Sequence, residues 1–192
     1  MTGQETIGKG TWIDKLASEL LEREKQIGRN TDLIRVESGL GASGIPHIGS
    51  LGDAVRAYGI KLALENFGYK SELIAYSDDL DGLRKIPEGL KVDADNIGRR
   101  VSDIDDPLCD KHGSFGEHMS SILLDGLDEL GIKYTHKTAH DTYKNNLLKE
   151  QIHEILVNSK KIGNKIEELT SQQKFQTVLP YFPVCHDCGR LY

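Results

Sequence analysis

Cysteine is scarce in this chain, with three among 192 residues, at positions 109, 185 and 188. An odd and sparse count excludes the disulfide framework of a small secreted protein. No apolar run approaches the roughly 20 residues of a membrane span, and the acidic residues among the first 30 exclude a secretory signal. Positive charge is also in deficit, with 24 Lys and Arg against 30 Asp and Glu, which argues against a protein that binds nucleic acid over its whole surface. We therefore expect a soluble, cytoplasmic protein without a membrane partner, and we favour a monomer.

Helix-like and strand-like segments alternate along the chain. Apolar residues at helical spacing predict helices over 11–27, 48–67, 115–130 and 145–158. Short apolar runs predict strands over 32–37, 73–76 and 132–138, with a further strand edge at 178–179. Residues 86–114 lack a clear period and are expected to leave the sheet. This order favours an α/β fold with a doubly wound, Rossmann-like parallel sheet.

A glycine-rich turn joins the first strand to the second helix. It reads Ser38-Gly-Leu-Gly-Ala-Ser-Gly-Ile-Pro-His-Ile-Gly-Ser50. The start of a helix presents free N–H groups to an anion, and glycine allows close approach of a ligand, so a nucleotide phosphate fits this turn. The spacing matches neither a dinucleotide fingerprint nor a Walker loop. A tight strand-to-helix turn with an incidental histidine is the alternative.

An acidic run follows the second strand, and it reads Ser77-Asp-Asp-Leu-Asp-Gly-Leu-Arg-Lys85. Asp79 and Asp81 would lie at the carboxyl end of that strand, the edge at which open parallel sheets bind ligands. Contact with a bound ligand and ordering of the loop are both possible roles for them there. Capping and solvation of a loop are the alternative roles for both carboxylates.

The two motifs together resemble those of a known family. His47-Ile48-Gly49-Ser50 is similar to the HIGH signature of class I aminoacyl-tRNA synthetases. In register with it, the run from Asp78 to Pro87 resembles the Asp-Asp-x-Asp-Pro-Leu-Arg-Lys-Val-Pro stretch of class I lysyl-tRNA synthetases. The likeness extends from about residue 11 to the final tyrosine.

The resemblance implies a lysine–tRNA ligase, which activates lysine with ATP and Mg²⁺ and transfers it to tRNA(Lys). It implies catalytic roles for His47 and Ser50, and substrate contacts for Gly41, Asp79 and Asp81. The ATP-binding set that it implies comprises Ser38, Gly39, Ala42, Ser43, Gly44, Ile45, Pro46, His47, Ile48, Gly49 and Ser50.

The chain departs from the family pattern at five positions, which are Gly41, Ala42, Ser50, Gly52 and Gly82. These departures bear on the tightness of ATP and lysine binding more than on the fold. Those at Ala42, Gly52 and Gly82 also support an alternative, a non-catalytic nucleotide-binding module. A further alternative is a nucleotidyltransferase that acts on another small substrate, since such enzymes share a similar histidine motif, although they lack the acidic run.

Two groups of residues suit zinc. Asp106, Cys109, His112 and His118 supply four ligand types within thirteen residues. Archaeal members of the family carry a similar cluster, although there the cysteine and histidine are adjacent. The alternative is a capping aspartate, a buried thiol and exposed histidines.

Cys185-x-x-Cys188 followed by Gly189 is typical of a zinc knuckle, and a redox pair is the rival interpretation. The pair supplies only half of a tetrahedral site.

We expect a helix in residues 1–30, a Rossmann-type catalytic domain over 31–180, and the start of a zinc-knuckle segment over 181–192. The family's Lys-Met-Ser-Lys-Ser loop and its helical anticodon-binding domain do not occur in this sequence. The chain is thus expected to be an N-terminal piece that is inactive alone.

Overall fold

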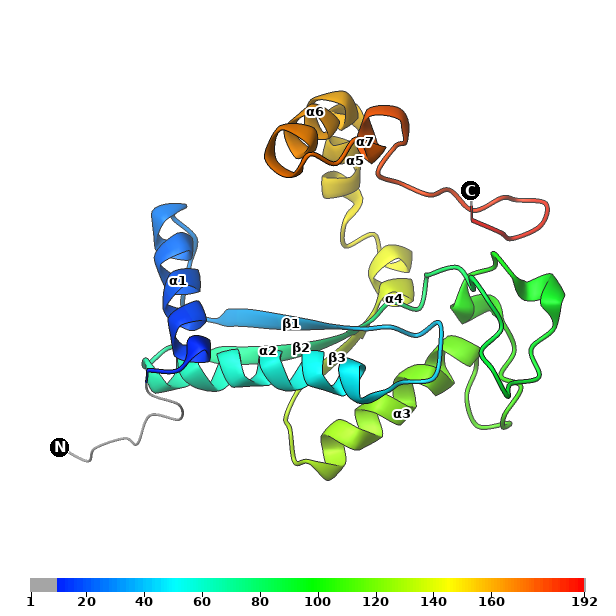
Figure 1. Ribbon diagram of the computed structural model, residues 1–192, viewed down its shortest axis with the longest axis horizontal. Helices are drawn as coiled ribbons and strands as arrows, with labels where there is room; N and C mark the ends of the chain where they lie inside the picture. Colours follow the sequence, from blue (N-terminus) through cyan, green and yellow to red (C-terminus); the bar gives the residue numbers. More distant parts are fainter. Residues whose placement is uncertain (1–9, 192) are drawn as a thin grey trace.

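A three-stranded parallel sheet organises the computed structural model, which describes residues 10–191. The strands are β1 (Ile34–Leu40), β2 (Ser71–Ser77) and β3 (Thr135–Thr138), hydrogen-bonded in the order β1-β2-β3. Their carboxyl ends meet at one edge, because Leu40 pairs with Ser77 and Ser77 pairs with Thr138. The predicted parallel α/β architecture is therefore confirmed (Figure 1).

Residues 10–191 also contain seven α-helices and two short 3₁₀ helices. The α-helices are α1 (Trp12–Gln26), α2 (Ile48–Asn66), α3 (Phe115–Glu129), α4 (Ala139–Lys144), α5 (Lys149–Val157), α6 (Ser159–Thr170) and α7 (Lys174–Thr177). The 3₁₀ helices are η1 (Ala94–Asn96) and η2 (Val101–Asp103). No helix within these residues is long and apolar enough to cross a membrane. Residues 1–9 of the predicted N-terminal segment lie outside the described range.

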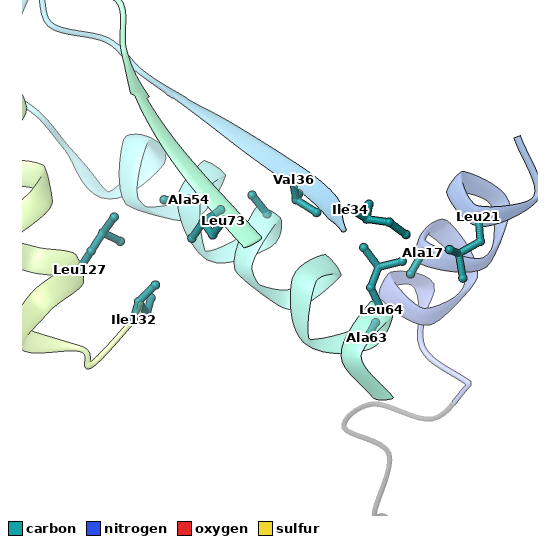
Figure 2. Close-up of a cluster of buried hydrophobic side chains, with 11 residues drawn as sticks. Ala17, Leu21, Ile34, Val36, Ala54, Ala63, Leu64, Leu73, Leu127 and Ile132 are labelled. Atoms are coloured by element: carbon teal, nitrogen blue, oxygen red, sulfur yellow. The ribbon is translucent and has the colours of Figure 1, made fainter. Parts of the chain in front are cut away.

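Helices α2 and α3 cover one face of the sheet. Residues of β1 alternate between buried and exposed, as expected for a strand with one covered face. Val36 of β1 and Leu73 of β2 pair in register and pack with Leu64 of α2 and Leu127 of α3 (Figure 2). Each fully buried leucine stabilises the fold by about 2 kcal/mol. On the opposite face, the Arg35 Nε and Glu72 Oε2 atoms lie 3.1 Å apart.

Helix α1 packs across the end of α2. It begins with a capping box, in which Thr11 Oγ1 accepts from Asp14 N–H and Asp14 Oδ2 accepts from Thr11 N–H. Ala17 and Leu21 form its buried face. Trp12 is 58% exposed, so the buried stripe is narrower than the apolar pattern predicts.

The excursion between β2 and α3 folds back as a second hydrophobic core. Val101 and Phe115 are fully buried in it, together with Ala42 from the glycine-rich turn. Gly116 allows this contact, since a Cβ there would lie 2.8 Å from Val101 Cγ2. The excursion therefore holds the glycine-rich turn and the start of α3 together.

The structure corrects two expectations about the second half of the chain. The helix predicted over 145–158 begins later, at Lys149 (α5), because Asn146 takes the left-handed conformation (φ 55°) after α4 ends at Lys144. Asparagine tolerates that conformation better than most residues. Residues 178–179 are not a strand, because Val178 N–H bonds to Lys174 O and closes α7.

All three predicted strands change their boundaries. The first runs from Ile34 to Leu40 and thus contains Gly39, the second is longer (Ser71–Ser77), and the third begins at Thr135 rather than Ile132.

Candidate functional site

The glycine-rich turn places His47 at the N-cap of α2. Its Nδ1 atom accepts a hydrogen bond from Gly49 N–H at 3.0 Å, and His47 N–H donates to Ser50 Oγ at 3.5 Å. Because Nδ1 acts as the acceptor, the proton of the neutral imidazole lies on Nε2. The exposed ring therefore offers an N–H donor at the positive end of the helix dipole.

Gly49 allows this arrangement. A Cβ at position 49 would lie 2.8 Å from His47 Cε1 and 2.9 Å from His47 Nδ1, both too short for real contacts. Glycine at position 49 is thus needed for the His47 imidazole to keep this position, whether or not a ligand is bound.

The remaining predicted ATP-binding residues divide by burial. Ala42 is completely buried in the second core, and Ser38 is buried with its Oγ lacking a hydrogen-bond partner. Ile45 and Ile48 are exposed apolar side chains beside His47, at 50% and 83%. The other members, half-buried or exposed, are Gly39, Gly41, Ser43, Gly44, Pro46, Gly49 and Ser50.

Asp79 has a structural hydrogen bond. Its Oδ1 accepts from His140 N–H in the first turn of α4 at 2.8 Å, and the side chain is buried. Burial raises the pKa of Asp79, opposed by the His140 backbone hydrogen bond. Asp81 is exposed, and its Oδ2 lies 3.6 Å from an Arg84 nitrogen.

Asp78 is the acidic residue that sequence reasoning missed. Its Oδ2 lies 3.2 Å from the position of a Cβ on Gly39, so this carboxylate adjoins the end of β1. Burial raises the pKa of Asp78, and the negative charges of Asp81, Glu37 and Asp79 add to that effect. Successive side chains of an extended segment point to opposite sides. This alternation could have indicated that Asp78 and Asp79 face different surroundings.

The structure brings the four predicted zinc ligands together. One ligand atom from each of Asp106, Cys109, His112 and His118 lies within 4.8 Å of all the others. Cys109 Sγ is 3.1 Å from both Asp106 Oδ2 and His112 Nδ1, and His118 Nδ1 is 2.7 Å from Asp106 Oδ2. Zinc bonds of usual length place tetrahedral ligands about 3.3–3.8 Å apart. The donor types therefore fit zinc, although two residues separate Cys109 from His112. These pairs lie at hydrogen-bonding distances, so their ligand atoms would move apart by roughly half an ångström to hold the ion.

Asp106 is buried among donors. Burial raises the pKa of its carboxyl, but hydrogen bonds from His118, Cys109 and Leu108 N–H outweigh burial and hold that pKa at about 2. A permanently ionised carboxylate suits a metal cation.

Cys185 and Cys188 lie in a separate tight turn. Cys185 N–H bonds to Arg190 O, Gly189 N–H bonds to Cys185 O, and Gly189 has φ 70°. Neither thiol belongs to the four-residue group. The turn docks on the excursion, because Leu191 N–H donates to Gly98 O and Arg190 Nε donates to Ile97 O.

Comparison with known proteins identifies the family. The family described as tRNA synthetases class I (K) matches residues 10–192. The chain belongs to this family. The three-stranded parallel sheet and the Asp/Cys/His group are thus features of a class I synthetase domain.

The relatives with a known name that we compared with this class I synthetase chain are lysine–tRNA ligases. A lysine–tRNA ligase of Cenarchaeum symbiosum (strain A) is 62% identical over 191 residues, which are 98% of this chain and 36% of the relative. A lysine–tRNA ligase of Archaeoglobus fulgidus is 30% identical over 182 residues, covering 94% and 35%. One of Rickettsia bellii (strain OSU 85-389) is 27% identical over 192 residues, covering 98% and 37%. The chain thus spans little more than a third of the length of these relatives.

Proposed function

We propose that this chain carries the ATP-binding and lysine-binding end of a lysine–tRNA ligase. The observation that carries the proposal is the His47–Gly49 geometry, which presents an Nε2–H donor at the start of α2. Family membership and the names of the relatives support the same activity.

In the proposed reaction, a lysine carboxylate oxygen attacks the α-phosphorus of ATP, and the bond to pyrophosphate breaks. Negative charge grows on the phosphate oxygens during this step. Nε2–H of His47 and the N–H groups at the start of α2 would stabilise that charge without reorganising, which is the usual source of such catalysis. Ser50 would act by orienting His47, because its hydroxyl accepts the His47 N–H.

The other residues of the glycine-rich turn would form the surface that contacts the nucleotide. The backbone of Gly39, Gly41 and Gly44 lets a ligand approach closely, and Ile45 and Ile48 offer apolar surface to an adenine ring. Mg²⁺ would enter with the ATP phosphates and neutralise part of their charge.

The substrate lysine would lie beside the acidic run. Asp81 is exposed and Asp78 adjoins β1, so these carboxylates could face an ammonium group. Asp79 would serve lysine binding by fixing the start of α4. We propose tRNA(Lys) as the acceptor of the lysyl group.

Zinc would be held by Asp106, Cys109, His112 and His118, with a structural role, since four protein ligands leave no open position. Cys185 and Cys188 would contribute two ligands to a second site. We propose a monomeric, cytoplasmic protein divided at residues 30 and 180, as the sequence predicts.

Isothermal titration of the chain with a non-hydrolysable lysyl-adenylate analogue tests the proposal. We expect His47→Asn to weaken binding by about tenfold to a hundredfold, since asparagine also caps helices but loses the imidazole donor. His153→Asn, on the exposed surface of α5, is the matched control. Equal binding of the lysyl and norleucyl analogues would instead favour a nucleotide-binding module that is indifferent to lysine.

A further inference from the structure

A basic groove of about 610 Å³ lies at the junction of α5 and α6, apart from the sites described above. Its lining includes Asn158, Lys160, Lys161, Asn164, Lys165 and Glu168. Three lysines thus stand against one glutamate, in a chain whose formal net charge is -6. This surface, which we name the α6 groove, is therefore a local positive patch on an acidic protein.

The positive charge of the α6 groove is only partly neutralised by the protein. Lys165 Nζ lies 2.7 Å from Glu168 Oε1, but neither Lys160 nor Lys161 forms an ion pair within residues 10–191. Both of these lysines lie in the first turn of α6, which carries no acidic residue. The positive end of the helix dipole lies there and repels them. Because this placement destabilises the helix, the two lysines are better explained by an anionic partner than by folding.

The α6 groove faces away from the body of the protein. Helix α7 covers the other side of α6, where a Cβ on Gly163 would collide with Phe175 O. Helix α5 has no buried residue, and Gly163 is the buried residue of α6. Figure 1 shows α5, α6 and α7 standing clear of the sheet, beyond α4. The three lysines are exposed, so a large partner can reach them.

The arm formed by α5, α6 and α7 leaves the sheet at its carboxyl edge. Strand β3 ends at Thr138, α4 begins at the next residue, and α5 follows it. The first turn of α4 is fixed to the end of β2 by the hydrogen bond from His140 N–H to Asp79 Oδ1. The glycine-rich turn and the acidic run follow strands at the same edge. A long molecule bound in the α6 groove can therefore extend toward the proposed ATP and lysine sites.

The spacing of the lysines suits a chain of phosphates better than a single anion. Lys161 and Lys165 are about one helical turn apart, a rise of about 6 Å, which is close to the distance between successive phosphates of a nucleic-acid strand. Asn164 beside them offers an amide donor, a common phosphate contact. Val157 is the apolar side chain in the lining, whereas a membrane surface or a protein partner needs a larger apolar area.

We propose that the α6 groove binds the phosphate backbone of an RNA, with Lys160, Lys161 and Lys165 as the phosphate contacts. The inference rests on the proposed ligase function, whose acceptor is an RNA, and it adds the surface that holds this acceptor. Contacts to the backbone fix orientation and carry no sequence information. The groove therefore positions the RNA with its end toward the carboxyl edge of the sheet, without selecting its sequence.

Fluorescence anisotropy of the chain with a labelled RNA hairpin that ends in a single-stranded 3′ tail tests the groove. We expect the combined variant Lys160→Gln, Lys161→Gln and Lys165→Gln to bind this RNA about tenfold to a hundredfold more weakly, because each exposed phosphate contact contributes a modest factor. The slope of log affinity against log salt should fall in magnitude by about 2 to 3, one for each lysine lost.

The matched control removes the same charge elsewhere. It combines Lys15→Gln, Lys70→Gln and Lys133→Gln, three exposed lysines on α1 and just before β2 and β3. These positions lie at the amino edge of the sheet, and salt screens distant charges, so RNA binding should be nearly unchanged. Circular dichroism verifies the fold of both triple variants.

Glu168→Gln tests the groove in the opposite direction. It removes the carboxylate from the lining and frees Lys165, so we expect RNA to bind about twofold to fivefold more tightly. Glu19→Gln is its control, because it also frees an exposed lysine, Lys15, but on α1. A purely structural role of the groove lysines would not produce tighter binding.

Three results would overturn the inference. One is an RNA that does not bind at low salt, and another is an equal loss of affinity in the groove and control triple variants. The third is binding to phosphatidylserine vesicles through the same lysines without binding to RNA, which would assign the groove to a membrane surface. Binding of the adenylate analogue, measured on the same variants, reports separately on the proposed ligase function and should be unchanged by the lysine substitutions.

Discussion

The imidazole of His47 occupies the space that a side chain at position 49 would need. His47 Nδ1 lies 3.0 Å from Gly49 N and 2.9 Å from the position of a Cβ on that residue. The two residues therefore depend on each other: the Gly49 N–H holds the ring, and a Cβ at position 49 would displace it.

Gly49→Ala should weaken ligand binding much more than it lowers the stability of the fold. Alanine forces the imidazole off Gly49 N–H, so we expect adenylate-analogue binding to fall at least tenfold, while helix propensity limits any loss of stability to about 1 kcal/mol. Gly52→Ala is the matched control, because a Cβ there meets nothing within 4 Å. It should raise stability by about 0.5–1 kcal/mol and leave binding unchanged. Equal binding by both variants would contradict the proposed role of His47.

Asp79 should make stability depend on pH. Burial raises the pKa of Asp79 in the folded state. The contribution of Asp79 to the free energy of unfolding is therefore fully present below its unfolded pKa, where the carboxyl is protonated. That contribution is lost as the pH rises through the folded pKa. An asparagine side chain at this position would keep the acceptor for His140 N–H without the charge.

We therefore expect Asp79→Asn to melt above the wild type at pH 7, with the difference shrinking toward about pH 3.5. Asp79→Ala should be about 1 kcal/mol less stable than Asp79→Asn at either pH, because both are uncharged and alanine lacks the acceptor for His140 N–H. Thermal unfolding followed by circular dichroism measures both. A difference between Asp79→Asn and wild type that is constant with pH would refute the pKa assignment.

Zinc content should follow the four-residue group. We expect the purified chain to bind zinc, and Cys109→Ser or His118→Ala to abolish binding at that group and lower the melting temperature, because structural zinc adds folding free energy. His153→Ala is the control for loss of an exposed histidine. Elemental analysis checks the outcome, and full zinc retention in both ligand variants would end the assignment.

Arg190 should hold the Cys185–Cys188 turn on the excursion. Its Nε and Nη2 donate to the carbonyls of Ile97 and Asp95 at 2.9 and 2.8 Å. We expect Arg190→Ala to speed hydrogen exchange at the amides of Leu191 and Cys185, whose bonds depend on this docking, by at least tenfold. Strand β2 should be unaffected. Unchanged exchange at Leu191 would show that the turn is held by other contacts.

Much of the fold could be predicted, because it depends on short-range patterns. The alternation of Ile34, Val36 and Leu40 marks a strand with one covered face, and Thr11 with Asp14 marks the start of α1. The break at Asn146 could not be predicted, since it depends on one residue adopting a left-handed conformation within a continuous apolar period.

The site was predicted less completely than the fold. The choice of metal-ligand residues rests on residue type, but their convergence depends on the path of the loop from Asp106 to His118. The acid run shows the same limit: Asp79 caps α4, which lies 61 residues away in sequence, and no local pattern predicts that contact.

Strand β1 has a hydrogen-bonded neighbour on one side only, among the residues that the structure describes. Its other side presents a row of unpaired N–H and C=O groups, which another polypeptide can join. If a parallel strand were added there, strand order would reverse beside the loop after Leu40, and that loop would open into the crevice where doubly wound sheets bind their ligands.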